Sequence, residues 1–275
     1  MPSKNNKAVD NSAIYIGKIP GEEALLAGDE IYEVFRVEDG LPLFLDDHLH
    51  RLEASFIKLG FKNHFQYTEL KDAVKQIIQQ NKLANTNIKI SCLIDKKGAC
   101  SKYIFSLPSI YPTPEMYSNG IQTILLEAER VDPNIKKGHT QVREMANSEI
   151  KKEHVFEALL VNHDGNITEG SRSNVFFMVG DTIYTAPSHI VLEGIMRMKV
   201  LELIQELGYK MKLECLHESQ LASIDAAFIT GTSPRILPIK RIGGHIIDVK
   251  HKMMRNLMTK LNEKIAAYKI SADTQ

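Results

Sequence analysis

The stretch Ile167-Thr168-Glu169-Gly170-Ser171-Arg172-Ser173-Asn174-Val175-Phe176 carries the most informative signal in this chain. The turn signal His163-Asp164-Gly165-Asn166 precedes it, and Gly194-Ile195-Met196-Arg197 opens a predicted helix further along. Glu169 lies at the end of a predicted strand and is followed by Gly170, which has no side chain to obstruct a ligand. The helix start then offers unpaired backbone N–H groups to an anion. Together they predict a site for a phosphorylated heteroaromatic group.

The composition is that of an ordinary globular protein. The 275 residues are 43% apolar and 25% charged, and Lys+Arg and Asp+Glu both total 34, so the formal net charge is zero. This balance favours neither nucleic acid nor an anionic membrane as a partner. The sequence has no apolar run of about 18 residues, as a membrane span requires. The polar N-terminus MPSKNNKAVDNS lacks the apolar segment of a signal peptide.

The three cysteines are Cys92, Cys100 and Cys215. They form no CxxC pair, and the histidine spacing near them does not indicate zinc. We therefore expect structural thiols, no metal site and a cytoplasmic location.

Local patterns predict two α+β domains. Residues 1–12 are expected to be a flexible tail, followed by a small N-terminal domain over 13–110. Its signals are a strand at 30–37, the hairpin turn Glu38-Asp39-Gly40, helices near 46–59 and 68–81, and strands at 87–95 and 101–107. Three prolines between 108 and 114 predict a linker, placed at 111–120.

A large C-terminal domain is predicted over 121–275, because strands and helices alternate there. The predicted strands lie at 121–127, 155–161, 173–179, 182–186, 209–215 and 226–230. The predicted helices lie at 141–153, 195–207 and 250–268.

Four blocks follow one another in the order of a known family. They are YEVFRV with DDHLHRL (32–52), FEALLVNHDGNITEGSRSNVFF (156–177), LEGIMR (192–197) and FITGTSPRILPI (228–239). With these blocks the chain resembles the class IV aminotransferases, the fold-type IV pyridoxal phosphate enzymes. That family includes branched-chain and D-amino-acid aminotransferases and aminodeoxychorismate lyase. The resemblance implies an α+β fold, with a smaller N-terminal α/β sandwich and a larger C-terminal domain with a barrel-like β core.

The resemblance implies pyridoxal 5′-phosphate as cofactor and two catalytic residues. The Schiff-base lysine is expected upstream of Glu157, where Lys136 and Lys137 are adjacent candidates. The hydrophobic residue before it and the interval to Glu157 favour Lys136. Its amine must be neutral to attack the aldehyde, so its surroundings must lower its pKa. Glu169 is expected against the pyridine nitrogen, where a carboxylate keeps that nitrogen protonated and the ring an electron sink.

The other implied contacts hold the cofactor and the substrate. Arg51 is expected to bind the phosphate through its guanidinium. Further donors to the phosphate are expected from the backbone of Ile195 and Met196 and from Thr232 and Ser233. Leu192 is expected to pack against the ring. Tyr32 and Val34 correspond to substrate-facing positions of the small-domain strand. Alternation places Arg36 on the same face.

The chain departs from two subgroups of the family. The arginine and histidine that hold the substrate carboxylate in D-amino-acid enzymes have no counterpart in 91–97. The tyrosine that follows the lysine in branched-chain enzymes is missing from Lys136-Lys137-Gly138-His139-Thr140-Gln141, so Arg143 is a candidate for its hydrogen bond.

The sequence favours an aminotransferase that moves the amino group of a small amino acid to a 2-oxo acid, with a slight preference for an L-branched-chain substrate. The family resemblance implies a homodimer. One alternative is aminodeoxychorismate lyase, which releases pyruvate and 4-aminobenzoate without a 2-oxo acid acceptor. Another is a non-catalytic relative that forms no Schiff base.

Overall fold

The structure is a computed structural model that describes residues 13–17, 20–21, 28–61, 65–96, 98–109, 111–138 and 140–273. The predicted tail, residues 1–12, lies outside the described residues. The chain divides into two compact units. The first comprises the residues up to Gly40, Leu45–Leu107 and Lys136–Gly138, and the second comprises Leu41–Phe44, Pro108–Ile135 and the chain after Gly138. The domain boundaries and linker inferred from the sequence stay predictions.

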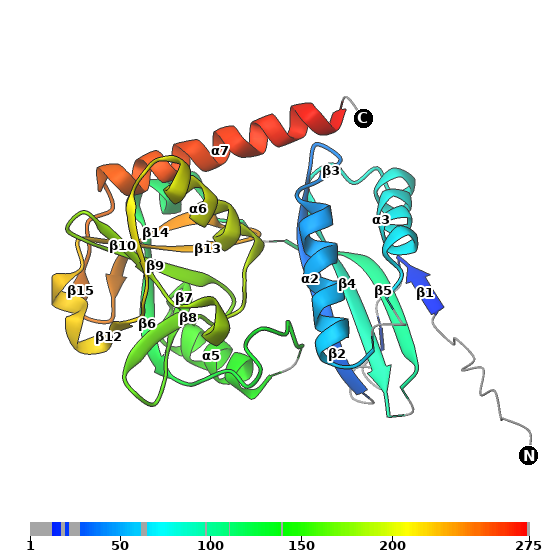
Figure 1. The fold of residues 1–275 in the computed structure, drawn as a ribbon, viewed down its shortest axis with the longest axis horizontal. Coiled ribbons are helices and arrows are strands. Elements are labelled where there is room, and N and C mark those ends of the chain that lie inside the picture. Colours follow the sequence, from blue (N-terminus) through cyan, green and yellow to red (C-terminus); the bar gives the residue numbers. More distant parts are fainter. Residues whose placement is uncertain are drawn as a thin grey trace, which may run out of the picture. The chain divides into compact units, whose positions relative to one another are not determined.

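The first unit is a sheet with two helices on one face (Figure 1). Its strands β1 (Ala13–Ile16), β2 (Gly28–Glu38), β4 (Thr86–Asp95) and β5 (Cys100–Leu107) lie in the order β1-β5-β4-β2. Only β1 and β5 run parallel among these neighbours. Helices α2 (Leu45–Lys58) and α3 (Tyr67–Gln80) contact β2 and β5. Asp39 and Gly40 both have positive φ, 53° and 81°, as a type I′ hairpin turn requires, so the predicted turn is confirmed.

Residues of β2 alternate between two faces of this sheet. Ile31, Phe35 and Val37 are fully buried at 0% exposure, on the face that the helices cover. Tyr32 and Val34 therefore lie on the opposite face. This second face carries the residues that the sequence assigned to the substrate.

The second unit is built on a large mixed sheet with the strand order β11-β10-β9-β13-β14-β6-β7-β8-β12, and β15 pairs with β14. Its strands are β6 (Ile121–Glu127), β7 (Glu157–Val161), β8 (Asn166–Gly170), β9 (Asn174–Val179), β10 (Thr182–Thr185), β11 (Lys210–Leu213), β12 (Leu216–His217), β13 (Ala226–Gly231), β14 (Arg235–Ile242) and β15 (His245–Ile246). The short β3 (Leu41–Pro42) also belongs to this unit. Its helices are α4 (Pro114–Asn119), α5 (Gln141–Lys152), α6 (Ile195–Glu206) and α7 (Lys252–Asp273), with 3-10 turns η2 (Ser188–Ile190) and η3 (Glu218–Ser223).

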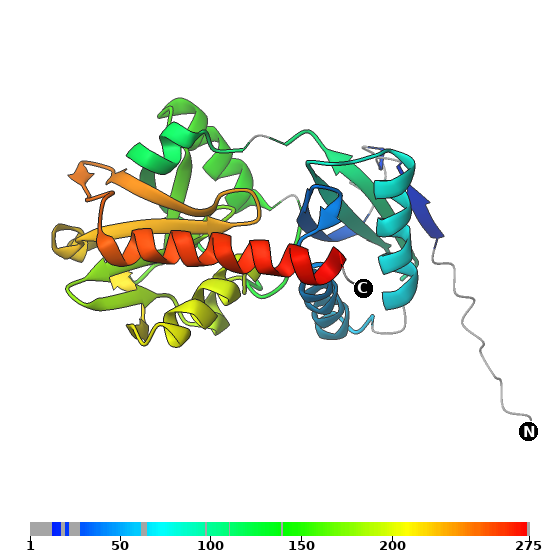
Figure 2. The same cartoon turned by 90° about the horizontal axis from the view of Figure 1, so that it is seen from above.

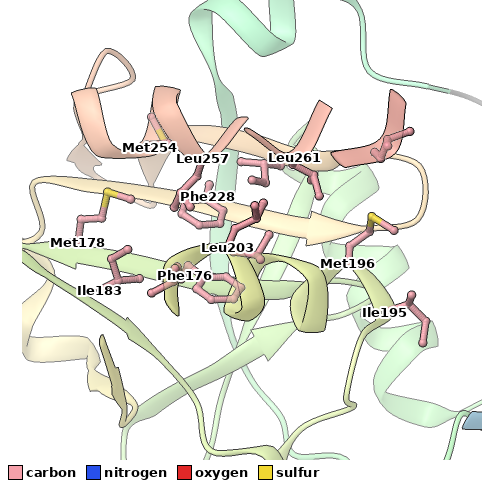
Figure 3. Close-up of a cluster of buried hydrophobic side chains, with 14 of the residues drawn as sticks. Phe176, Met178, Ile183, Ile195, Met196, Leu203, Phe228, Met254, Leu257 and Leu261 are labelled. Atoms are coloured by element: carbon pink, nitrogen blue, oxygen red, sulfur yellow. The ribbon is translucent and has the colours of Figure 1, made fainter. Parts of the chain in front are cut away.

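Apolar side chains fill both faces of this sheet. On one face, α7 runs along α6 and over β13 and β14 (Figures 1 and 2). Between these helices and the sheet, the rings of Phe176 and Phe228 stack with centroids 4.9 Å apart (Figure 3). The other core includes Val175, Ile167 and Leu216, from β9, β8 and β12. Because strands far apart in the sheet order share this second core, the sheet curls around it, which confirms the predicted barrel-like β core.

Several elements were not predicted from the sequence. Strand β14 contains Pro238 within its ladder, and α4 lies where a linker was expected. Strand β8 confirms the strand that was expected at Glu169. In α4, Pro114 occupies the first turn and the Thr113 hydroxyl accepts from the Met116 N–H at 3.3 Å, an arrangement that favours a helix start. Among the described residues, none of the helices combines the length and apolar character needed to cross a bilayer.

Candidate active site

The segment that carries Lys136 pairs with the edge of β2 in the first unit. The Tyr32 N–H donates to the Lys136 carbonyl at 3.0 Å, and the Gly138 N–H donates to the Glu30 carbonyl at 3.0 Å. Between these two bonds Lys137 forms an antiparallel bridge with Ile31. The lysine segment is therefore held by backbone hydrogen bonds, as a short extra strand.

The Lys136 side chain lies over the ring of Tyr32, with its Nζ 5.0 Å from the ring centroid. Lys89, on β4, places its Nζ 4.6 Å from the same centroid. Such cation–ring contacts are favourable because the ring face is electron-rich. The structure thus brings together two residues that the sequence assigned to catalysis and substrate, and adds Lys89, which the sequence analysis missed.

The carboxylate of Glu30 fills the space beside Gly138. A Cβ built on Gly138 would lie 1.8 Å from Glu30 Oε2, so only glycine fits there without a shift. Glu30 is 5% exposed, accepts a short hydrogen bond from the Ser91 hydroxyl, and pairs with Lys89 Nζ at 2.6 Å. The glycine after the two lysines was the available sequence signal for this contact.

Arg51 projects from α2 and binds Glu33 in a forked geometry. Its Nε donates to Glu33 Oε1 at 2.8 Å and its Nη2 donates to Oε2 at 2.7 Å. His48 Nδ1 lies 2.8 Å from the same Oε2. Burial by itself would raise the pKa of Glu33, but the Arg51 charge and the hydrogen bonds from His48 and Arg51 lower that pKa to about 2. Burial lowers the pKa of His48.

In the second unit, the predicted Glu169 is 2% exposed and held at both oxygens. Oε2 accepts the Leu192 N–H at 3.2 Å, and Oε1 lies 3.6 Å from Arg130 Nη1. The structure therefore joins Glu169 to Leu192, which the sequence also assigned to the cofactor. Arg130 was missed, because one arginine near a strand end gives no signal of its own.

A second buried carboxylate shapes the turn after Glu169. Glu157 is 1% exposed and accepts from the Ser171 and Ser173 hydroxyls at 2.6 and 2.8 Å. A Cβ built on Gly170 would lie 2.1 Å from Ser173 Oγ. Gly170 therefore leaves room for the Ser173 hydroxyl, and the close approach of a ligand at this glycine stays a prediction.

The predicted anion cradle is the start of α6, after Gly194. Within the described part of the chain, the N-cap residue Gly194 provides no side-chain cap. The first backbone N–H groups of a helix have no intrahelical partner, so those of Ile195 and Met196 suit an anion. Asn174 holds the approach to the helix, because its Nδ2 donates to the Leu192 carbonyl at 2.8 Å. A Cβ built on Gly194 would lie 2.2 Å from Asn174 Oδ1, so a glycine is required there too.

Arg197 lies in the first turn of α6 and is 1% exposed. Its guanidinium donates to the Ala186 carbonyl at 2.7 Å and to the Ser188 hydroxyl at 3.1 Å. Burial lowers the pKa of Arg197, whereas the negative charges of Glu193 and Glu169 act to raise it. It therefore adds a buried cationic side chain at the helix start.

Thr232 and Ser233 lie in the turn between β13 and β14. The last paired residues of β13 and β14 before this turn are Gly231 and Arg235. On the other side of β13, Thr230 pairs with Asn174 on β9. Within the second unit, Asn174 thus connects the β13 end with Leu192 and Gly194. Blocks that are far apart in the sequence meet here.

Comparison with known proteins identifies the family. The sequence profile of the family described as amino-transferase class IV matches residues 30–242, and the chain belongs to this family. The D-alanine aminotransferase of Bacillus licheniformis is 29% identical over 251 residues, which are 86% of this chain and 88% of that protein. The putative branched-chain-amino-acid aminotransferase of Methanocaldococcus jannaschii is 27% identical over 273 residues, 94% of this chain and 93% of that protein.

A solved structure confirms the fold. The putative 4-amino-4-deoxychorismate lyase of Legionella pneumophila has a TM-score of 0.82 at 20% identity, covering 92% of this chain and 99% of that chain. The resemblance read from the four sequence blocks, the fold-type IV architecture and the class of pyridoxal phosphate-dependent aminotransferase are confirmed.

Class IV aminotransferases use pyridoxal phosphate, and the residues present fit that group. The uncapped start of α6 suits a phosphate, and the buried Glu169 suits a ring nitrogen that carries a proton. The carbonyl carbon of the cofactor requires an amine, for which Lys136 stays the residue predicted from the sequence.

Proposed function

We propose that this protein transfers the amino group of a small amino acid to a 2-oxo acid, with an L-branched-chain amino acid as the preferred donor. The observation that carries the proposal is the buried Glu169, held by Leu192 N–H at 3.2 Å and by Arg130 at 3.6 Å. A fixed, buried carboxylate suits a cofactor ring that must accept electrons. The preference for an L-branched-chain donor is supported by the missing arginine–histidine pair in 91–97.

Lys136 is the residue proposed to act on the reacting atoms. Its Nζ would bind the cofactor's carbonyl carbon, yield that position to the amino acid, and then take the proton from the substrate Cα. When bound, pyridoxal phosphate supplies a conjugated ring that accepts the electron pair left on Cα. Tyr32, whose ring lies 5.0 Å from Lys136 Nζ, would orient this amine and the substrate beside it, with Val34 on the same face.

The remaining proposed residues hold the cofactor. Glu169 would face the ring nitrogen, and Leu192 would contact the ring. Donors to the phosphate would be Arg51, Ile195, Met196, Thr232 and Ser233. The two carboxylate oxygens of Glu33 accept hydrogen bonds from Nε and Nη2 of Arg51, and this pair fixes the direction of the Arg51 guanidinium.

A second function is favoured by one observation. Lys89 Nζ lies 4.6 Å from the ring centroid of Tyr32, so a second cation shares the face that carries Lys136. An additional cation suits a substrate with an extra carboxylate, as aminodeoxychorismate has. The alternative is therefore aminodeoxychorismate lyase.

Absorption spectra of the purified protein with pyridoxal phosphate distinguish these functions. The visible band of the lysine-bound cofactor should bleach with L-leucine, and an added 2-oxo acid should restore it. Bleaching by D-alanine alone would contradict the proposed L-branched-chain preference. Pyruvate released from aminodeoxychorismate without a 2-oxo acid would establish the lyase. A cofactor band that never forms would refute both functions.

We also propose a cytoplasmic homodimer. The three cysteines are free, which suits a reducing compartment, and the dimer follows from the family resemblance. Light scattering of the purified chain should give twice 31.0 kDa. A mass of one chain at micromolar concentration would contradict the dimer.

A further inference from the structure

Thr230 has a buried hydroxyl with no role in the fold described so far. The residue is 1% exposed, and its Oγ1 has no hydrogen-bond partner among the described residues. Buried hydroxyls are normally bonded, because losing water without a replacement is unfavourable. In the same sheet, the Thr185 hydroxyl donates a hydrogen bond to the Val175 carbonyl at 2.8 Å, and the Thr168 hydroxyl donates one to the Leu160 carbonyl at 3.2 Å. Thr230 is the exception to this pattern.

Strand pairing places Thr230 at the approach to α6. Thr230 on β13 lies directly opposite Asn174 on β9, so their side chains share one face, with Cβ atoms about 5 Å apart. Asn174 in turn contacts Gly194, where a Cβ would lie 2.2 Å from its Oδ1. Alternation along β13 puts Thr230 on the face of Phe228, which shares a core with Ile195 and Met196 of α6 (Figure 3).

The surroundings of Thr230 favour an anion. The start of α6 has no side-chain cap, and its partial positive charge attracts negative groups. Arg197, in the first turn of the same helix, is a buried cation whose guanidinium donates to the Ala186 carbonyl and the Ser188 hydroxyl. The nearby acids are Glu193, which acts electrostatically on Arg197, and Glu169, which contacts Arg130 and the Leu192 N–H. An uncapped helix start and a buried hydroxyl without a partner are independent observations, and they point to the same ligand.

We propose that Thr230 Oγ1 donates a hydrogen bond to the phosphate group bound at the start of α6. This residue is additional to the phosphate contacts expected from the sequence, and the inference rests on the proposed function in that the phosphate is the cofactor's. A hydroxyl fits this buried place because it donates a hydrogen bond without adding a charge.

The test compares binding of pyridoxamine 5′-phosphate to the apo-protein, a ligand that needs no bond to Lys136. Thr230→Val removes the donor and keeps the shape of the side chain, whereas Thr230→Ser keeps the donor. Thr185→Val is the matched control, because it removes a buried hydroxyl whose partner is a backbone carbonyl. Calorimetry should show a Kd about 10- to 100-fold higher for Thr230→Val, as for a lost hydrogen bond to a charged group. Thr230→Ser and Thr185→Val should stay near wild type.

Phosphorus NMR of the bound ligand separates a contact from a packing effect. The resonance should shift in Thr230→Val and return in Thr230→Ser. An unchanged Kd would overturn the inference and indicate that a buried water satisfies the hydroxyl. A raised Kd with an unchanged resonance would also overturn it, because the effect would then be packing.

Failure of the proposed function gives a different result. In that case pyridoxamine 5′-phosphate binding would still respond to Thr230→Val, while pyridoxal phosphate would form no bond with Lys136 and no amino group would be transferred. If transfer proceeds normally and Thr230→Val binds the ligand as wild type does, only the inference about Thr230 fails.

Discussion

The segments that carry the two proposed catalytic residues are held in different ways. Lys136 lies on a strand-like segment fixed by backbone hydrogen bonds along the edge of β2. Glu169 lies inside the large sheet, among the buried polar side chains of Glu157, Thr168, Ser171, Ser173 and Asn174. An edge segment tolerates changes of side chain as long as its backbone can pair. A buried polar network does not, because each group removed leaves its partner without a hydrogen bond.

The sharpest test of the edge segment is Lys136→Ala. The backbone pairing should persist, so the protein should fold, but covalent cofactor and turnover should be lost, the latter by on the order of 10³-fold or more. Borohydride reduction followed by peptide mapping would locate the attachment. Lys137→Ala is the control and should keep both properties. Trapped cofactor on Lys137 would reverse the assignment.

Glu169→Ala tests the buried network. The cofactor should remain covalently attached, since Lys136 is untouched, while turnover falls by roughly 10²- to 10³-fold because the electron-accepting ring loses its fixed carboxylate. Steady-state kinetics and the visible spectrum measure both effects. Glu169→Gln keeps the size of the side chain and should be as slow as Glu169→Ala. Turnover near wild type in either variant would remove Glu169 from its proposed role.

Gly138→Ala tests whether the edge segment is fixed by backbone pairing alone. A methyl group there would meet the Glu30 carboxylate, and the lysine segment should move by a fraction of an ångström or more. Turnover should fall by about 10²-fold with little change in the unfolding midpoint, as expected for a misplaced catalytic group. Gly244→Ala is the control, because a Cβ there meets nothing within 4 Å. Equal turnover in the two variants would show that the Glu30 side chain moves aside without displacing the lysine segment.

The free energy of unfolding at acidic pH depends on the ionisation of Glu33. Its pKa is lowered from 4.5 to about 2 in the folded protein, so its contribution is complete above pH 4.5 and is lost as the pH falls towards 2. Denaturant unfolding between pH 5 and 2 should therefore show a shallower loss of stability in Glu33→Gln than in wild type. Parallel curves would mean that Glu33 has an ordinary pKa when folded.

Thiol reactivity gives the smallest effect. Burial raises the pKa of Cys215 to about 11, while a hydrogen bond with Cys100, together with burial, raises the pKa of Cys92. Cys92 and Cys215 should therefore react slowly with a disulfide reagent at pH 8, and half-buried Cys215 should react before Cys92. Fast modification of Cys92 in the folded protein would show that the first unit opens readily.

The sequence predicts the parts of this molecule that depend on local chemistry. Asp39-Gly40 marks a turn, because its positive φ angles suit these two residues. Strand β14 was missed because Pro238 cannot donate to a ladder, and prolines are uncommon inside sheets. The prolines near 108–114 were assigned to a linker, although Pro114 begins a helix capped by Thr113.

Contacts between distant segments were beyond the sequence. Gly138 indicates that some group lies close to the lysine segment, but nothing in the sequence identifies that group as the Glu30 carboxylate, and nothing near Arg130 indicates a contact with Glu169. Arg197 resembles a solvated helix residue in the sequence but is buried, since it bonds the carbonyl of Ala186. These contacts depend on tertiary packing, which overrides the local preference of each residue.

The three residues Lys136–Gly138 belong to the first unit, although the chain on both sides of them belongs to the second. The smaller unit is therefore not a continuous piece of the polypeptide, and it cannot be obtained by cutting the chain once. A fragment ending at Leu107 would lack Lys136–Gly138 and would expose the edge of β2 with which they pair, and an exposed strand edge favours aggregation. Grafting or exchanging this unit between relatives would require moving both stretches of sequence together.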